Sequence, residues 1–93
     1  MKVYIAGKIT GDSEYWTKFW QAAEKLVNQG HIVLNPANLP EGMGAADYMR
    51  ICFAMIDAAD LCVFLPDWEE SRGARLERAY CEYIGKKVET WSD

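Results

Sequence analysis

Short hydrophobic runs alternate along this chain with longer segments in which hydrophobic residues recur every three or four positions. The runs are rich in β-branched and aromatic residues and stop at glycine, proline or polar residues, a pattern that predicts strands. The longer segments have the spacing of amphipathic helices. We therefore predict strands at 2–7, 31–35, 61–66 and 86–91, and helices from Asp12 or Ser13 to Gly30, at 45–59 and at 72–84.

The same spacing predicts which side of each helix faces the core. On the first helix the expected buried stripe consists of Trp16, Phe19 or Trp20, Ala23, Leu26 and Val27. On the third helix it consists of Leu76, Ala79, Tyr80, Tyr83 and Ile84. Glu77 lies about 100° round the helix from Leu76, at the edge of that stripe. Ser71 is expected to cap the third helix and Gly85 to end it.

The order of these elements predicts a doubly wound fold. Strands that alternate with helices require right-handed crossovers and a parallel sheet with helices on both faces. The predicted fold class is α/β, a three-layer Rossmann-like or flavodoxin-like parallel sheet with strand order 2-1-3-4. Ligands of such sheets bind in the crevice at the carboxyl ends of strands 1 and 3. We expect that crevice between the loop of Gly7 and Lys8 and residues 67–73.

Composition and charge limit the possible functions. The 93 residues are 51% hydrophobic and 26% charged, which is typical of one globular domain spanning 1–93. The net charge is −4 and no basic run occurs, so we expect a small-molecule ligand and no nucleic-acid polymer. The longest uncharged apolar run, 61–65, is far too short to cross a membrane, and the N-terminal run is too short for a signal peptide. We therefore expect no membrane association and a cytoplasmic location.

No metal and no redox cofactor are expected. Cys52, Cys62 and Cys81 are odd in number, widely spaced and located in predicted helices or a strand, so we interpret them as reduced core residues. The one histidine, His31, starts a strand far from the predicted crevice and receives no catalytic role. The sequence offers no cluster of metal ligands.

Residues 71–73 have the composition of an anion site. The first amides of a helix are free and carry partial positive charge, Gly73 leaves room for a ligand near the backbone, and Arg72 can add charged donors. The same residues also fit a plain helix cap at Ser71 followed by a solvated arginine. The sequence leaves both interpretations open.

Glu77 is the candidate nucleophile. One turn beyond Gly73, its carboxylate is expected to face the mouth of the crevice and to be kept ionised by the helix N-terminus and by nearby arginines. Such a carboxylate can attack an electrophilic carbon, for example the anomeric carbon of a sugar, and form a covalent intermediate. The alternative is a surface glutamate paired with an arginine.

Four further residues have both a functional and a structural interpretation. Asp60 and Asp67 either contact a ligand or serve as turn residues. Tyr4 either contacts a ligand or fills the core, where aromatic strand residues are common. Trp68 either stacks on a flat ring in the crevice or covers the end of the sheet.

Three segments carry a resemblance to a known family. With VYIAGKITG at the start, DAADLCVFL in the middle and SRGARLERAYCEYIGKKV at the end, the chain resembles the nucleoside 2-deoxyribosyltransferase superfamily. It looks closest to a branch of short bacterial and phage proteins. The similarity covers roughly residues 1–88 and includes the order of the elements.

The resemblance implies roles for individual residues. The family's tyrosine in Y-x-x-G, its aspartate before strand 3 and its nucleophilic glutamate in G-x-x-x-E correspond to Tyr4, Asp60 and Glu77. Glu77 is implied to attack the anomeric carbon of a nucleoside, Tyr4 to position Glu77, and Asp60 to serve the base or its proton transfer. Ser71 stands where the similar 2'-deoxynucleoside 5'-phosphate N-hydrolases have a phosphate-contacting serine, which implies a phosphorylated ligand.

The resemblance also implies a homodimer or larger homo-oligomer. Both enzyme groups take a site residue from a neighbouring subunit through a segment after the last core strand, whereas the sequence here stops at Asp93. Either the contact between subunits is built differently, or the site is incomplete.

The expected function is cleavage or exchange of the N-glycosidic bond of a (deoxy)nucleoside or its 5'-monophosphate, without a cofactor. Two alternatives stay open. One is a non-catalytic nucleotide-binding module that keeps the phosphate cradle. The other is a protein-interaction domain in which Trp16, Trp20 and Trp68 contact a partner.

Overall fold

The computed structural model describes residues 1–92, which form alternating strands and helices in the expected order. Two short 3₁₀ turns, η1 (Pro36–Asn38) and η2 (Trp68–Glu70), follow the second and third strands. The main elements are β1 (Lys2–Ala6), α1 (Tyr15–Asn28), β2 (Ile32–Leu34), α2 (Ala45–Ala58), β3 (Leu61–Phe64), α3 (Arg72–Ile84) and β4 (Val88–Thr90). The predicted bounds of α3 are confirmed, and Gly85 ends this helix with a φ of 73°, a conformation that favours glycine.

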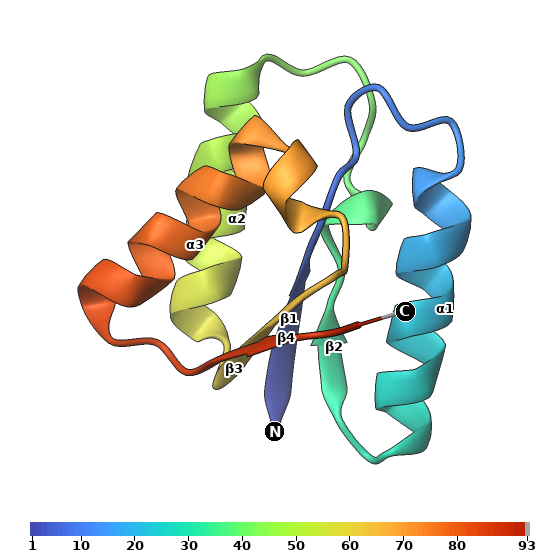
Figure 1. The fold of residues 1–93 in the computed structure, drawn as a ribbon, viewed down its shortest axis with the longest axis vertical. Coiled ribbons are helices and arrows are strands. Elements are labelled where there is room, and N and C mark those ends of the chain that lie inside the picture. The colour runs from blue at the N-terminus through green and yellow to red at the C-terminus, as the bar shows by residue number, and fades with distance from the viewer. Residues whose placement is uncertain (93) are drawn as a thin grey trace.

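The sheet has the predicted topology. Its strands are all parallel and lie in the order β2-β1-β3-β4, which confirms the three-layer α/β fold. Helix α1 covers one face of the sheet, and α2 and α3 lie side by side on the other (Figure 1). The strand order reverses between β1 and β3, so the switch point lies where the sequence predicted it.

Alternation along the central strands divides the core into two halves. Odd-numbered residues of β1 and β3, such as Val3 and Val63, pack against Phe19 and Leu26 of α1. Even-numbered residues face α2 and α3, where Tyr4 joins a cluster with Ala6, Cys52, Ile56, Ala59, Cys62, Phe64 and Cys81. Because successive side chains of a strand point to opposite faces, this register directs Tyr4 toward α3.

The buried side of α3 differs from the prediction. Ala74, Glu77 and Cys81 face the sheet, whereas Leu76 and Tyr83 are 50% and 92% exposed. The expected stripe of Leu76, Ala79, Tyr80, Tyr83 and Ile84 is therefore wrong as a core face, although Tyr80 stacks on Phe53 of α2 with ring centroids 4.2 Å apart. Small residues let the helix approach the sheet closely, which the bulky stripe would prevent.

The structure also decides between the alternatives for α1. Phe19, Ala22 and Leu26 are buried, while Trp16, Trp20 and Val27 are each more than half exposed. The helix begins at Tyr15 with Glu14 at the N-cap position and no side-chain cap bond, so the expected cap by Asp12 or Ser13 is wrong; Asp12 instead accepts from the Glu14 amide at 2.8 Å in the preceding turn. The helical spacing of the apolar residues thus predicted that this segment is a helix, but not which side of the helix faces the sheet.

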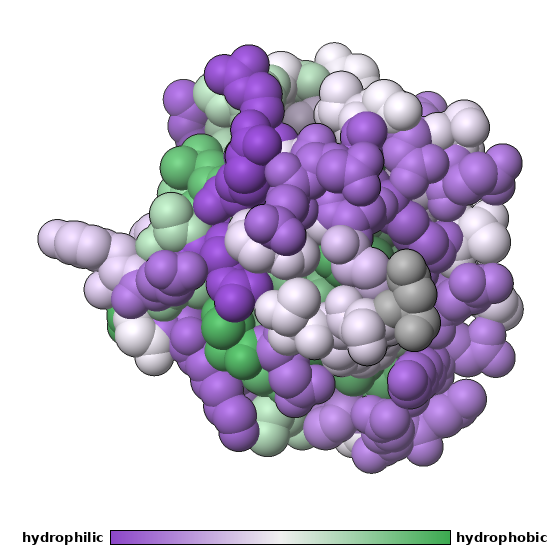
Figure 2. Space-filling view, viewed as in Figure 1, coloured by the Kyte–Doolittle hydropathy of each residue, from purple (hydrophilic) through white to green (hydrophobic). Residues whose placement is uncertain are grey.

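The surface seen in Figure 2 is mostly hydrophilic, with hydrophobic areas that are small and separate. None of the helices within residues 1–92 combines the length and the hydrophobicity needed to cross a membrane. The three cysteines are buried and free, as expected for core residues.

Candidate functional site

A hydrogen-bonded pair of Tyr4 and Glu77 lies between the sheet and α3. Tyr4 points from the middle of β1 into the half of the core that α2 and α3 cover. Its hydroxyl donates to Glu77 Oε2 at 2.8 Å. Tyr4 is 1% exposed and Glu77 is 5% exposed. The structure therefore brings together two of the three residues to which the family resemblance gave catalytic roles.

Burial controls the protonation of Glu77. Loss of solvation raises the pKa of its carboxyl group to about 7, while hydrogen bonds from Tyr4 and Cys52 oppose this rise because they favour the ionised form. The pKa of the Tyr4 hydroxyl is raised well above its ordinary value, first by burial and then by repulsion from Glu77. Tyr4 therefore stays protonated and donates, and Glu77 titrates in the neutral pH range.

The expectation that arginines and the helix N-terminus keep Glu77 ionised is wrong, because burial raises the pKa of its carboxyl group. Arg75 donates to the carbonyl oxygen of Glu69 at 3.0 Å, and Arg78 donates to Thr90 Oγ1 at 2.9 Å. Neither arginine is a hydrogen-bond partner of Glu77, so the carboxyl group loses water without gaining a positively charged partner. The alternative of a surface glutamate paired with an arginine is wrong for the same reason.

Cys52 is a member of this site that the sequence analysis did not identify as functional. It lies on α2, is 5% exposed, and packs in the same buried cluster as Tyr4. Its spacing from Ile56, one helical turn away, indicates a core position. The sequence contains no signal that α2 brings this thiol into the cluster of Tyr4, because this packing depends on how α2 lies on the sheet.

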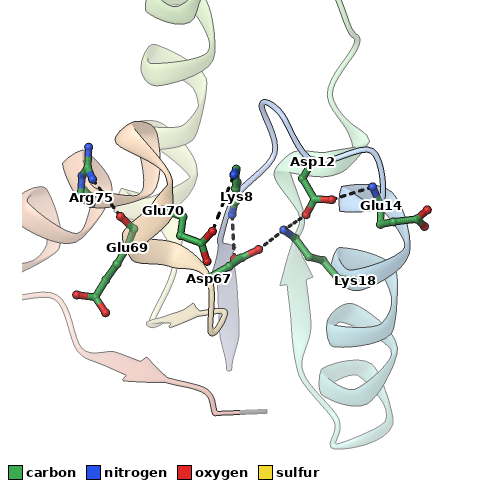
Figure 3. A network of polar contacts seen from close by, with 8 residues as sticks. All are labelled: Lys8, Asp12, Glu14, Lys18, Asp67, Glu69, Glu70 and Arg75. Atoms are coloured by element: carbon green, nitrogen blue, oxygen red, sulfur yellow. Dashed lines mark hydrogen bonds and ion pairs between the residues drawn. The ribbon is translucent and has the colours of Figure 1, made fainter.

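The expected crevice at the carboxyl ends of β1 and β3 is crossed by charged side chains (Figure 3). Asp67 accepts from the Lys8 amide at 3.1 Å and from the Lys18 ammonium group. Lys18 also pairs with Asp12, so the loop after β1, the helix α1 and the end of β3 are tied together. Asp67 thus bridges two loops. Sequence analysis missed Lys18 because this partner lies 49 positions away.

Close packing at the carboxyl ends of β1 and β3 requires a glycine at position 7. A Cβ atom on Gly7 would lie 3.0 Å from Leu65 Cδ1 and 3.3 Å from Asp67 Oδ1. The absence of a side chain therefore lets the loop after β1 pass close to the end of β3. The Lys8 ammonium group lies 4.0 Å from Glu70 Oε1 in η2. Gly7 and Lys8, which the sequence predicted to contact a ligand, thus both pack against other residues of the chain.

The start of α3 shows the predicted cap. Ser71 Oγ accepts from the Ala74 amide at 3.1 Å, and Arg72 is exposed. The open side of Gly73 is filled by Met49 of α2, whose Cε would lie 3.3 Å from a Cβ on Gly73. A role of Ser71, Arg72 and Gly73 in binding an anion stays a prediction.

Replacement of Gly73 by alanine tests that prediction. We expect Gly73→Ala to leave the free energy of unfolding unchanged or to raise it by up to about 1 kcal/mol, because alanine favours a helix and the mobile end of Met49 can yield. Affinity for a nucleoside 5'-monophosphate should fall about tenfold or more if its phosphate approaches this backbone. Thermal denaturation and titration calorimetry measure the two effects. The matching nucleoside without phosphate is the control, and an equal loss of its affinity would contradict a phosphate site.

Trp68 covers the end of the sheet. Its ring meets Phe64 edge-on, with centroids 5.6 Å apart and planes at 71°. The guanidinium group of Arg78 lies over the same indole at 4.8 Å. Of the two contacts predicted for Trp68, the structure shows the one that shields the sheet.

Asp60 does not join this site. It immediately precedes β3, where its Oδ2 accepts from the Lys2 amide at 2.8 Å and its Oδ1 lies 3.5 Å from Lys2 Nζ. Lys2 starts β1, so Asp60 lies at the amino ends of the parallel strands, whereas the crevice lies at their carboxyl ends. The expectation that Asp60 acts beside Glu77 is therefore corrected for a single chain, in which Asp60 connects the starts of two strands.

Two surface hollows lie along α1 and do not include Glu77. One of about 330 Å³ lies between α1, the end of β3 and Trp91, with Lys18 and Lys25 at its border. The other, of about 420 Å³, follows the outer side of α1. Since Glu77 is only 5% exposed, a ligand reaches its carboxyl group only after the covering side chains move.

The fold and the site define a small doubly wound α/β domain with a buried tyrosine–glutamate pair beside the switch point of its sheet. Residues 1–90 match the family described as Domain of unknown function (DUF4406), and the chain belongs to this family. A comparison with curated proteins found no match.

Proposed function

We propose that this protein binds a nucleoside or nucleotide and cleaves or exchanges its N-glycosidic bond with Glu77 as the nucleophile. One observation carries the proposal: the Glu77 carboxyl group is buried, accepts a bond from Tyr4 at 2.8 Å and has a pKa raised to about 7. A carboxyl pKa that burial raises strongly is typical of functional sites. A purely structural position would be filled as well by an uncharged residue.

The proposed reaction has two steps. The ionised Glu77 attacks the anomeric carbon, the bond from that carbon to the base breaks, and its electron pair goes to the base nitrogen, which takes up a proton. Water or a second base then displaces Glu77 from the sugar, which gives hydrolysis or exchange. Tyr4 fixes the orientation of the carboxyl group through Oε2. A pKa of about 7 keeps a reactive fraction ionised at neutral pH.

The proposed substrate contacts lie one turn from Glu77. Free backbone amides at the start of α3, together with Ser71 and Arg72, suit a 5'-phosphate. Met49 lies against Gly73 and is a side chain that substrate binding would displace. Neither contact requires a cofactor.

A second copy of the chain is the proposed partner. The outer side of α3 exposes Leu76, Tyr83 and Ile84, which are 50%, 92% and 42% exposed. Large apolar side chains gathered on one helix favour a protein contact. This supports the homo-oligomer that the resemblance implies, and light scattering would measure its mass.

The test is a panel of ribo- and deoxynucleosides and their 5'-monophosphates, incubated with purified protein while free base is followed by chromatography. Wild type and Asp60→Asn should release base from the same substrate at similar rates, because Asp60 lies at the amino ends of the strands, away from the crevice. Glu77→Ala should release none. Asp60→Asn costs little stability, since its ion pair with Lys2 is half exposed.

The outcome separates the proposal from its rivals. Absence of base release from every substrate would overturn the reaction and, if a nucleotide still binds, leave a non-catalytic binding module. Trp16 and Trp20, each about half exposed on α1, favour the second candidate, a protein-interaction domain. Tryptophan fluorescence that responds to no nucleotide would favour that candidate.

A further inference from the structure

The inference concerns Lys18, whose ammonium group connects two loops at the carboxyl ends of the central strands. Figure 3 shows this group between the carboxylates of Asp12 and Asp67, and it donates to both of them. Asp12 lies in the loop after β1, Asp67 follows β3, and Lys18 lies near the start of α1. The three side chains are each 24% or 25% exposed, so water screens their attraction only in part.

The two carboxylates also hold the backbone of the loop between β1 and α1. Asp67 Oδ1 accepts from the Lys8 amide at 3.1 Å, and Asp12 Oδ1 accepts from the Glu14 amide at 2.8 Å. The hydrogen bond from Lys18 lowers the pKa of the Asp12 carboxyl group, which favours the ionised form that accepts these bonds. Lys18 therefore contacts the two side chains that hold the beginning and the end of this loop.

The same loop places the Lys8 side chain next to the predicted phosphate site. The Lys8 ammonium group lies 4.0 Å from Glu70 Oε1, and Glu70 immediately precedes Ser71, the N-cap residue of α3. The Glu70 side chain is 69% exposed, so this ion pair is weak and an anionic ligand can replace the carboxylate. Lys18 differs from Lys8 because two carboxylates neutralise its charge. Lys8 is thus the lysine of this network that can bind an anion.

We propose that Lys18 is a positioning residue, which holds the loop after β1 so that the Lys8 ammonium group binds the 5'-phosphate of the ligand at the start of α3. The proposal rests on the function proposed above and adds a cation to the contacts of Ser71 and Arg72. Lys18 does not contact the ligand and acts through Asp67, whose carboxylate fixes the Lys8 backbone. The role is specific to phosphorylated ligands, because a nucleoside offers no charge to Lys8.

Hydrogen exchange of the Lys8 amide tests the positioning role without a ligand. In Lys18→Met the two carboxylates lose the cation between them and repel each other, so we expect the Lys8 amide to exchange about tenfold faster or more. Nuclear magnetic resonance measures this rate. Lys25→Met is the matched control on the same helix and should leave the rate unchanged, because the Lys25 ammonium group lies over the Trp91 ring, 4.9 Å from its centroid.

Titration calorimetry with the common deoxynucleoside 5'-monophosphates and the matching nucleosides tests the contact with the ligand. Lys18→Met and Lys8→Met should each lower the affinity for a monophosphate that the wild type binds by about tenfold or more, and the affinity for its nucleoside by at most about twofold. The double variant should bind the monophosphate no more weakly than Lys8→Met, because Lys18 acts through Lys8. Lys25→Met should bind both ligands as the wild type does.

Three results would overturn the proposal. One is an unchanged exchange rate of the Lys8 amide in Lys18→Met, the second is an equal loss of affinity for monophosphate and nucleoside, and the third is a double variant much weaker than Lys8→Met. If Lys18→Met does not fold, Asp67→Ala decides. Its lost negative charge by itself favours an anion, so a lower affinity for the monophosphate supports the proposal, and an equal or higher affinity contradicts it.

Failure of this inference is distinct from failure of the proposed reaction. A wild type that releases base from nucleosides but binds no monophosphate would overturn the role of Lys8 and Lys18 and leave the reaction in place. A wild type that binds a monophosphate without releasing base would overturn the reaction, while the variants still decide on the two lysines. Absence of binding to every ligand would overturn both.

Discussion

Glu77→Gln should make the protein more stable at pH 8 and abolish base release. Folding moves this carboxyl group from an ordinary pKa of 4.5 to a pKa of about 7. The folded chain therefore binds the proton more tightly than the unfolded chain. The resulting stability is fully present below pH 4.5, decreases as the pH rises toward 7, and is gone above the folded pKa. The wild type should lose about 3 kcal/mol across this range from Glu77 alone.

Glutamine removes this pH dependence because it has no proton to lose. Its amide oxygen can still accept from Tyr4, while its buried amide donors need new partners, so we expect a net gain of roughly 1–2 kcal/mol at pH 8. The melting temperature should rise by about 5–10 °C for a domain of this size. The gain should shrink toward pH 5, where Glu77 is neutral.

Thermal denaturation between pH 5 and pH 8 measures this effect, with Glu24→Gln on the exposed side of α1 as the matched control. The control should keep the pH dependence of the wild type. A Glu77→Gln variant with that same dependence would mean that Glu77 is not the buried carboxyl group that the structure shows. In the base-release assay the rate should fall about a thousandfold or more, as for loss of a nucleophile, while ligand binding persists.

Tyr4→Phe should slow base release at pH 7 by about tenfold or more and move its pH dependence upward. The hydroxyl of Tyr4 donates to Glu77 at 2.8 Å and both side chains are buried, and such a bond to a charged group contributes about 1.5–3 kcal/mol. Its loss penalises the ionised carboxylate, so the pKa of Glu77 should rise from about 7 by roughly one to two units. Less nucleophile is then available at neutral pH.

The pH profile of the release rate measures this shift, and Tyr80→Phe is the matched control. Tyr80 also donates to a carboxylate, Asp57 at 2.7 Å, but on the surface of the α2–α3 pair. Its removal should leave both the rate and the profile unchanged. A Tyr4→Phe variant that is slower at every pH by the same factor would show that Tyr4 acts on geometry and not on the ionisation of Glu77.

Much of the fold follows from patterns within short stretches of the chain. The run at 2–7 reads as a strand because its residues are hydrophobic on both sides, and Val3 to Ala6 are indeed buried. The cap of Ser71 and the left-handed Gly85 mark the ends of α3 because their effects are local. The order of elements then determines a parallel sheet, since the handedness of crossovers leaves few topologies.

The candidate site could be predicted only in part. The family resemblance identified Tyr4 and Glu77, and their bond agrees with the implied pairing. It assigned Asp60 to the same site, although Asp60 lies at the amino ends of the strands and the crevice lies at their carboxyl ends. Cys52 and Met49 lacked any signal, because the contacts of α2 with β1 and α3 depend on packing between segments far apart in the sequence.

The sequence by itself determined the elements, their order and the parallel topology, because periodicity and capping act over a few residues. Only the tertiary structure decided which side of α3 faces the sheet. The apolar stripe through Leu76 and Tyr83 is the more hydrophobic side, yet small Ala74 and Cys81 allow close approach to the sheet. That orientation places Glu77 in the core, where the Tyr4 hydroxyl is its hydrogen-bond partner. There the surrounding strands and helices exclude water from the carboxyl group, and this burial raises its pKa to about 7.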